Sequence, residues 1–167
     1  DCLLQNDAAH VFAVDVAYGI LAWELRQDAR VTVMERTNAR HLTAEQLGKL
    51  CDLVTVDVAF ISLTKIYPAI DRILKPDGRC VCLKPQFEAK PFQLGKNGIV
   101  KDPAILPPLI GSLIDAAADN HLYLQGLTVS PIHGTNGNVE YLLYLTRGSA
   151  VSAAEREQLI ADALAAR

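Results

Sequence analysis

The sequence predicts an α/β fold, in which a mainly parallel sheet carries helices on both faces and closes with an antiparallel hairpin. Short apolar runs rich in β-branched residues alternate with longer segments whose apolar residues recur at helical spacing. The last two apolar runs are joined by a segment rich in Gly and Asn, which is typical of a hairpin. The chain has 167 residues, of which 50% are hydrophobic and 21% charged, so it can form one packed domain.

The first half of the chain predicts three strands with helices between them. The third strand, around Val54 and Val56, is an apolar run rather than an alternating pattern, so we expect it to be buried on both faces. The helix before it should begin at Thr43, because Thr43-Ala44-Glu45-Gln46 matches a capping box. We therefore predict strands over residues 10–16, 30–35 and 52–58, and helices over residues 20–27 and 43–50.

The second half continues the alternation. Pro68 lies inside the first helical pattern and marks a kink or a late start of the helix. Lys75-Pro76-Asp77-Gly78 has the composition of a turn, and residues 85–103 form a long loop of the kind that usually has a function. We predict helices over residues 62–74, 104–120 and 150–167, and strands over residues 79–84, 123–129 and 139–146.

Composition excludes several classes of function. No apolar run approaches the roughly 20 residues needed to span a bilayer, and the first residues lack the pattern of a signal peptide, so we expect a cytoplasmic protein without a membrane partner. The cysteines have no zinc-ligand spacing, and Cys80 and Cys82 should share one buried face of a strand. We therefore predict no metal site. With a net charge of −3, any nucleic acid must be held by a local basic patch or by a further domain.

Charged residues follow several of the predicted strands. A carboxylate buried without a partner would cost several kcal/mol, so Asp57 is expected at the carboxyl edge of the sheet, where α/β sheets bind ligands. Capping of the next helix is an equally good interpretation from spacing alone. Asp15 ends the first strand, where an acid can accept hydrogen bonds from the ribose hydroxyls of a nucleotide. Lys84 reaches the same edge as Asp57, although a solvated lysine would have the same sequence context.

The terminal hairpin requires one antiparallel strand, and the arrangement resembles the class I methyltransferase fold that binds S-adenosylmethionine. Six segments are similar, in sequence and order, to the TlyA (hemolysin A) family of FtsJ-like ribosomal RNA 2′-O-methyltransferases. The resemblance as a whole covers about residues 1–146, and we expect a methyltransferase domain over residues 1–147 and a C-terminal helix over residues 148–167. The segments are V-D-V-A-Y-G-I-L-A-W-E-L-R-Q-D, E-R-T-N-A-R, D-V-A-F-I-S-L, K-P-Q-F-E, G-K-N-G-I-V-K-D-P and G-N-V-E-Y-L-L-Y-L.

The resemblance implies methyl transfer from S-adenosylmethionine to a ribose 2′-hydroxyl, with ribosomal RNA or ribosomal subunits as the partner. The family's catalytic set is a Lys-Asp-Lys-Glu tetrad, whose last three members correspond to Asp57, Lys84 and Glu140. A ribose hydroxyl is a poor nucleophile, so Lys84 would act as the base or orient the hydroxyl, held by the two carboxylates. Taken alone, Glu140 would be a surface residue beside a hairpin turn.

The resemblance also assigns cofactor-binding residues, and the predicted loops carry several basic residues. The cofactor-binding residues are Asp15, Tyr18, Asn38 and Asp57, with Asn38 at the adenine edge, although Asn38 could equally be a turn residue. Contacts with RNA phosphates are one interpretation of the loop cations, and ordinary solvation is the simpler one. These cations are Arg36, Arg40, Lys90, Lys96 and Lys101.

The chain departs from the family pattern in ways that leave alternatives open. The family's first strand and glycine-rich turn, of the type A-L-D-x-G-x-x-x-G-G-F, come just before the region where this sequence begins. We therefore expect the sequence either to be a fragment, inactive by itself, or to omit disordered residues of the protein. Ala17 stands where Gly is more common, and V-C-L-K-P is one residue shorter than usual. A noncatalytic binding module or hemolysin on the same scaffold, and a small-molecule methyltransferase, are the alternative functions.

Overall fold

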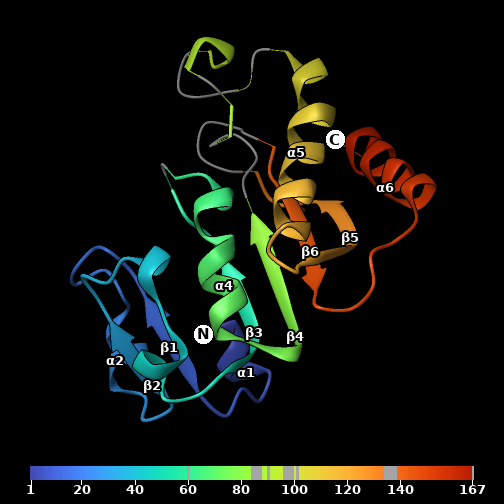
Figure 1. Ribbon diagram of the computed structural model, residues 1–167. Coiled ribbons are helices and arrows are strands. Elements are labelled where there is room, and N and C mark those ends of the chain that lie inside the picture. The colour runs from blue at the N-terminus through green and yellow to red at the C-terminus, as the bar shows by residue number, and fades with distance from the viewer. Residues whose placement is uncertain are drawn as a thin grey trace. The chain divides into compact units, whose positions relative to one another are not determined.

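The computed structural model describes residues 1–59, 61–83, 88–89, 91–95, 100, 102–133 and 139–166. The chain divides into two compact units, Asp1–Lys49 and Leu50–Arg167 (Figure 1). The predicted mixed α/β class is confirmed in both. Within the described part of the chain, no helix is long and apolar enough to cross a membrane.

The first unit is built on two parallel strands. Val11 pairs with Val31, and the register continues to Val14 and Met34. None of the residues in these two strands is buried, and the buried apolar side chains of the unit are those of Leu4, Leu42 and Leu47. The elements are α1 (Cys2–Gln5), β1 (Val11–Val14), α2 (Trp23–Gln27), β2 (Val31–Met34), η1 (Ala39–His41) and α3 (Ala44–Leu47).

Local signals explain where the helices of this unit begin and end. The predicted capping box is confirmed, because the Gln46 backbone N–H donates to Thr43 Oγ1 at 3.4 Å and the Thr43 N–H donates to Gln46 Oε1 at 3.0 Å. Gly48, with φ of 71°, ends α3 in the left-handed conformation. The prediction that a helix begins at residue 20 was wrong, since α2 begins at Trp23. Gly19 has φ of 76°, which interrupts any helix there.

The second unit contains a four-stranded sheet in the order β3-β4-β6-β5. β3 and β4 are parallel, whereas β6 is antiparallel to both β4 and β5, so β6 alone runs against the other strands. The predicted hairpin is thus confirmed, and β6 is inserted between β4 and β5. The elements are β3 (Cys51–Val56), η2 (Leu63–Lys65), α4 (Tyr67–Ile73), β4 (Leu74–Leu83), η4 (Pro91–Gln93), η6 (Pro103–Ile105), α5 (Leu106–Ala118), β5 (Tyr123–Val129), β6 (Tyr141–Thr146) and α6 (Ala153–Ala165).

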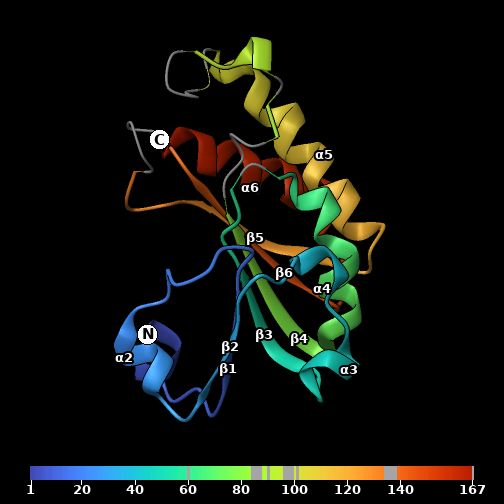
Figure 2. The same cartoon turned by 90° about the vertical axis from the view of Figure 1, so that its left-hand side faces the viewer.

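Apolar side chains of the central strands and helices form the core of the second unit. Tyr141, Leu143 and Leu145 alternate along β6 and are buried. α4 and α5 lie along the same side of the sheet, and α6 packs against β5 and α5 (Figure 2). Cys80 and Cys82 are fully buried with their Sγ atoms 3.4 Å apart, which confirms the prediction that they belong to the core. Their mutual hydrogen bond and burial raise the pKa of the Cys82 thiol.

Three local predictions in this unit are tested by the structure. β3 is not buried on both faces, because Leu53 is 40% exposed and β3 pairs only with β4 among the described strands. The late start at Pro68 is confirmed, since Pro68 occupies the first turn of α4 after the separate turn η2. The predicted turn at residues 75–78 is instead an irregularity within β4, where Leu74 pairs with Cys51 and Arg79 with Leu53.

Candidate active site

Two carboxylate residues of the second unit lie at the same edge of its sheet. β3 ends at Val56, which pairs with Cys82 of β4, and Cys82 pairs with Leu143 of β6. Asp57 directly follows β3, and Glu140 directly precedes β6. Because β6 runs in the opposite direction, its first residues lie at the edge where β3 and β4 end. Asp57 and Glu140 therefore lie beside the ends of the two strands that flank β4. These two strands are about 10 Å apart, because each strand spacing is about 4.8 Å.

The two carboxylates differ in their surroundings. Asp57 is exposed, as expected for a residue emerging at the carboxyl edge. It does not cap the next helical turn, because that role belongs to Ser62, whose Oγ accepts a hydrogen bond from the Thr64 N–H at 3.1 Å. Glu140 is 6% exposed and is the one charged residue that is buried as a whole among the described residues, so its interpretation as a surface residue was wrong. A buried carboxylate is stable only with polar or charged partners.

Lys84, the third predicted member of the tetrad, lies outside the described residues, as do Lys90, Lys96 and Lys101. The backbone on its N-terminal side is described, since Leu83 pairs with Leu142 as the last pair of β4 and β6. β4 lies between β3, which leads to Asp57, and β6, which follows Glu140. Lys84 is the next residue in the sequence after β4.

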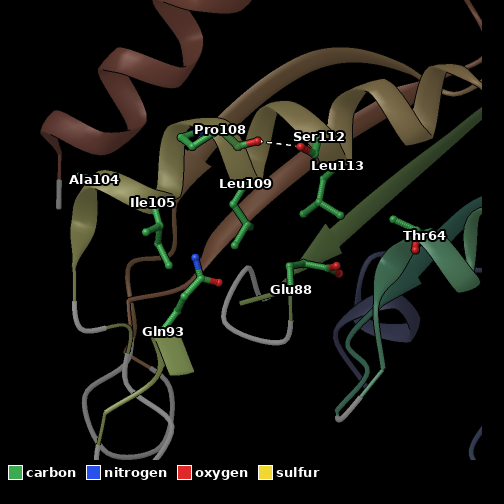
Figure 3. A pocket seen from close by; sticks show the side chains of 9 residues that line it. All are labelled: Thr64, Glu88, Gln93, Ala104, Ile105, Pro108, Leu109, Ser112 and Leu113. Atoms are coloured by element: carbon green, nitrogen blue, oxygen red, sulfur yellow. Dashed lines mark hydrogen bonds between the residues drawn. The ribbon is translucent and has the colours of Figure 1, made fainter. Parts of the chain in front are cut away.

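Glu88 forms a polar cluster with the segment that follows Asp57. Its Oε2 accepts a hydrogen bond from Ser62 Oγ at 2.7 Å, and its Oε1 accepts one from the Leu63 backbone N–H, also at 2.7 Å. Figure 3 shows the Glu88 carboxylate pointing toward the segment of Thr64. We refer to Glu88, Ser62, Leu63 and Thr64 as the Glu88 clasp. Sequence reasoning did not identify it, although Glu88 is the last residue of the K-P-Q-F-E segment.

An open groove of about 410 Å³ lies beside this clasp. Its apolar side comes from η6 and α5, and polar side chains lie on the opposite side (Figure 3). The Ser112 hydroxyl donates to the Pro108 carbonyl oxygen at 2.9 Å and so remains tied to its own helix. The lining residues are Thr64, Glu88, Gln93, Ala104, Ile105, Pro108, Leu109, Ser112 and Leu113.

In the first unit, Asp15 directly follows β1 and begins a turn. Its Oδ1 accepts a hydrogen bond from the Ala17 backbone N–H at 2.7 Å. Its own backbone is held on both sides, because Asp15 N–H donates to the Met34 carbonyl at 3.1 Å and Thr37 N–H donates to the Asp15 carbonyl at 2.9 Å. The Asp15 backbone is therefore fixed against β2 and the segment that follows it.

Glu35 fixes the same turn from the end of β2, and sequence reasoning did not predict this role. Its side chain is 8% exposed and accepts a hydrogen bond from the Gly19 backbone N–H at 2.8 Å. Both of its oxygens also accept from the Arg26 guanidinium. The hydrogen bond with Arg26 and, to a smaller extent, that with Gly19 lower the pKa of Glu35. Glu35 is therefore held as a carboxylate, with Arg26 on one side and the turn on the other.

The other two predicted cofactor residues lie in the neighbouring turns. Tyr18 is 69% exposed, and the Arg36 guanidinium carbon lies 4.6 Å from the centroid of its ring. Asn38 caps η1, because its Oδ1 accepts from the Arg40 backbone N–H at 3.1 Å and from Arg40 Nε at 3.2 Å. The interpretation of Asn38 as a turn residue is confirmed, and its side-chain NH₂ group is still able to donate elsewhere. Among the described residues, no group of three or more His, Cys, Asp or Glu side chains is able to hold a metal ion.

Comparison with known protein families agrees with this geometry. The family model described as FtsJ-like methyltransferase matches residues 1–147, most of the chain. The chain belongs to the FtsJ-like methyltransferase family. The expected resemblance is thereby confirmed for the segments that carry Asp15, Asp57 and Glu140.

Individual relatives of this FtsJ-like chain bear related names. It is 47% identical over 147 residues to YqxC of Bacillus subtilis and 45% identical over 146 residues to the 16S/23S rRNA (cytidine-2′-O)-methyltransferase TlyA of Mycobacterium tuberculosis. These matches cover 87% of the chain but 52% and 54% of the two relatives. The chain thus spans about half the length of the curated relatives that it matches. It is also 37% identical over 146 residues to hemolysin A of Brachyspira hyodysenteriae, covering 86% of the chain and 61% of that protein.

Solved structures agree with the FtsJ-like fold. A Streptococcus thermophilus protein that bears the hemolysin name has a TM-score of 0.89 at 38% identity, over 99% of this chain and 62% of that one. A TehB-like S-adenosylmethionine-dependent methyltransferase from Corynebacterium glutamicum has a TM-score of 0.55 at 13% identity, over 87% of this chain and 72% of that one. The second likeness concerns the fold alone, and it confirms the predicted class I methyltransferase architecture.

Proposed function

We propose that the chain is the catalytic part of an S-adenosylmethionine-dependent enzyme that methylates the 2′-hydroxyl of ribose in ribosomal RNA. The observation that carries this proposal is the position of Asp57 and Glu140 beside the ends of the two strands that flank β4, with Lys84 next in the sequence after β4. The family membership and the names of the relatives support the same reaction. Ribosomal RNA or a ribosomal subunit is the proposed partner, which implies action in the cytoplasm.

Each residue of the proposed catalytic set has a chemical role. Lys84 takes or orients the proton of the ribose hydroxyl, so that the oxygen becomes nucleophilic at the moment of transfer. Asp57 and Glu140 are proposed as the carboxylate partners of the Lys84 ammonium group. The burial of Glu140 strengthens its interaction with a cation, because its surroundings have a lower dielectric constant. The same carboxylates favour the charged form of a lysine, so Lys84 must lose a proton before it can act as a base.

The residues of the first unit fit the adenosine part of the cofactor. Asp15 uses Oδ1 within its own turn, and its Oδ2 accepts no hydrogen bond from the described residues, which leaves an acceptor for ribose hydroxyls. Asn38 retains NH₂ donors that suit the adenine edge, and the exposed Tyr18 ring is proposed to contact the same ligand. Asp57, in the second unit, is also proposed as a cofactor-binding residue. S-adenosylmethionine, when bound, supplies the methyl group from its sulfonium centre.

The domain assignment and the RNA contacts are part of the proposal. Residues 1–147 form the methyltransferase domain, and residues 148–167, which include α6, are a C-terminal addition. Arg36 and Arg40 follow β2 and are proposed to contact RNA phosphates, which position an RNA without reading its sequence.

The test replaces Lys84 by alanine in the full-length protein. We expect methyl transfer to unmethylated ribosomal subunits to fall by at least about 10²-fold, the range typical of a lost acid or base. The dissociation constant for S-adenosylmethionine should stay within a few-fold. Lys65→Ala, which changes an exposed lysine of η2, is the matched control and should keep wild-type activity.

The possible results separate the alternatives. Wild-type activity in Lys84→Ala would remove Lys84 from the mechanism. Absence of S-adenosylmethionine binding by the full-length wild-type protein would indicate a noncatalytic module, and transfer to small acceptors but not to ribosomal RNA would indicate a small-molecule methyltransferase.

A further inference from the structure

Four large apolar side chains are exposed within one short segment of the first unit. Val16, Tyr18, Ile20 and Trp23 are each between 66% and 69% exposed. They make up half of the large apolar side chains that are exposed among the described residues, and their segment connects β1 with α2 (Figure 2). Exposed apolar side chains that occur singly are common in proteins, whereas a group of them indicates a surface that contacts another molecule. We refer to residues 16–23 as the apolar loop.

The backbone of the apolar loop is held by hydrogen bonds although its side chains are exposed. The Ala17 N–H donates to Asp15 Oδ1 at 2.7 Å, and the Ala17 carbonyl oxygen accepts from the Arg36 N–H at 3.1 Å. The Gly19 N–H donates to Glu35 Oε1 at 2.8 Å. A loop that is already fixed loses less conformational entropy when it binds a partner. The exposed side chains are therefore presented on a preorganised backbone.

An arginine lies beside the apolar loop and forms no ion pair with a carboxylate among the described residues. Arg36 is exposed, and its guanidinium carbon lies 4.6 Å from the centroid of the Tyr18 ring. Its φ of 52° is a left-handed conformation that residues with a side chain rarely adopt. The acid that precedes it, Glu35, has both oxygens on the Arg26 guanidinium instead. The loop thus combines exposed aromatic rings with a cation that is available to an anionic partner.

Single-stranded RNA has the chemistry that matches this combination. Its unstacked bases have flat faces that stack on aromatic side chains and on arginine, and its phosphates are negatively charged. An apolar protein surface would match Ile20 and Trp23 but would bury the Arg36 cation without a partner, which is costly. RNA is therefore the partner that fits both the apolar side chains and the cation.

We propose that Trp23 and Ile20 form a stacking surface for unpaired bases of the RNA substrate, with Arg36 contacting a phosphate beside them. The inference rests on the proposed function, in which RNA is the substrate and Tyr18 belongs to the cofactor site. The indole ring of Trp23 stacks on a base, and Ile20 adds apolar contact area. Since every base has a flat face, this surface binds RNA without reading its sequence.

The first experiment measures the affinity of the full-length protein for a single-stranded RNA of mixed sequence and about 12 nucleotides, a length within the usual site size. We expect Trp23→Ala to weaken binding by about 5- to 100-fold, the effect of one lost stacking contact, and Trp23→Phe to stay within a few-fold of the wild type. Ile20→Ala should weaken binding several-fold. Ile132→Ala, which changes an isoleucine that is 72% exposed in the second unit, is the matched control and should bind as the wild type does. Wild-type affinity in Trp23→Ala, or an equal loss in Ile132→Ala, would overturn the proposal.

The salt dependence of binding separates stacking from charge. Arg36→Ala should reduce the slope of log K against the logarithm of the salt concentration by about one, as expected for one lost phosphate contact. Trp23→Ala should lower the affinity at every salt concentration and leave this slope unchanged. A reduced slope in Trp23→Ala would overturn the stacking role, because the loss would then come from a displaced cation.

Hydroxyl-radical footprinting of Trp23 tests the partner without measuring activity. We expect the Trp23 side chain to be oxidised in the free full-length protein and protected when the RNA is bound. Protection without RNA would show that another part of the protein or a second copy covers the apolar loop, and oxidation unchanged by saturating RNA would show that the RNA binds elsewhere. Either result overturns the proposal. Absence of methyl transfer by a wild-type protein whose Trp23 is protected by RNA would instead contradict the proposed function and leave this inference standing.

Discussion

Different interactions stabilise the interior of each of the two units. In the second unit, the sheet places fully or nearly fully buried side chains such as Cys80, Leu124 and Leu145 on three adjacent strands. In the first unit, none of the residues in β1 and β2 is buried, and a two-stranded sheet of this kind has little stability of its own. Apolar burial therefore stabilises the second unit, whereas polar contacts such as those of Glu35 have a larger share in the first.

The loops of the two units are nevertheless held by the same kind of hydrogen bond. In each unit a carboxylate accepts a hydrogen bond from a backbone N–H of a segment that follows a predicted site residue, Glu35 from Gly19 and Glu88 from Leu63. Charge-assisted hydrogen bonds of this type hold a loop without requiring a large apolar side chain in it. The comparison indicates that the sheets differ in how they are stabilised, while the segments beside the predicted site residues are positioned in the same way.

The largest expected effect comes from the core of the second unit. Leu145 is completely buried in the middle of the sheet, so Leu145→Ala should lower the free energy of unfolding by about 2–5 kcal/mol, the usual range for a buried leucine. Leu53→Ala, at an exposed position of β3, is the matched control and should cost much less. Urea unfolding followed by circular dichroism measures both. Equal losses of unfolding free energy in the two variants would contradict the conclusion that apolar burial stabilises the second unit.

A smaller effect is expected from the polar contacts of the first unit. Arg26→Ala removes the cation that holds both oxygens of Glu35, and the turn around Gly19 should become less ordered. We expect several-fold weaker binding of S-adenosylmethionine in titration calorimetry of the full-length protein. Arg30→Ala removes an arginine whose ion pair is with Asp28, away from this turn, and should bind the cofactor as the wild type does. A binding loss as large in Arg30→Ala would show that Glu35 has no specific role.

Most of the fold could be predicted from sequence because its elements have strong local signals. Apolar runs, helical spacing and the Thr43 capping box gave the alternation of strands and helices correctly. The insertion of β6 between β4 and β5 has no such signal, since strand order depends on pairing between residues far apart in the chain. The turn chemistry of residues 75–78 was overridden because Leu74, just before them, already pairs with Cys51.

The candidate site was predictable in part. Asp57 was expected at the carboxyl edge of the sheet, where the structure has it, and the resemblance to a known family pointed to Glu140. Glu35 and Glu88 were missed, because a single acid at a strand end or in a loop looks like a solvated charge. Their roles depend on hydrogen bonds to Gly19 and Ser62, which are 16 and 26 residues away. The one available signal was that both acids lie within the segments that resemble the family.

The smallest expected effect concerns an exposed ion pair of the first unit, Asp28 with Arg30. The hydrogen bonds from Arg30 lower the pKa of Asp28 from 3.8 to about 2. A lowered pKa means that the folded state favours the charged carboxylate, so the contribution to stability is complete above pH 3.8 and is lost as the pH falls toward 2. Asp28→Asn should therefore remove a small part of the acid dependence of unfolding in this window and leave stability at pH 7 only slightly reduced, because exposed pairs contribute little. Acid titration followed by circular dichroism tests this, and 1 M salt, which screens charges beyond about 3 Å, should reduce the difference between variant and wild type. A large effect that persists in salt would mean that this pair is as important to the first unit as the buried side chains are to the second.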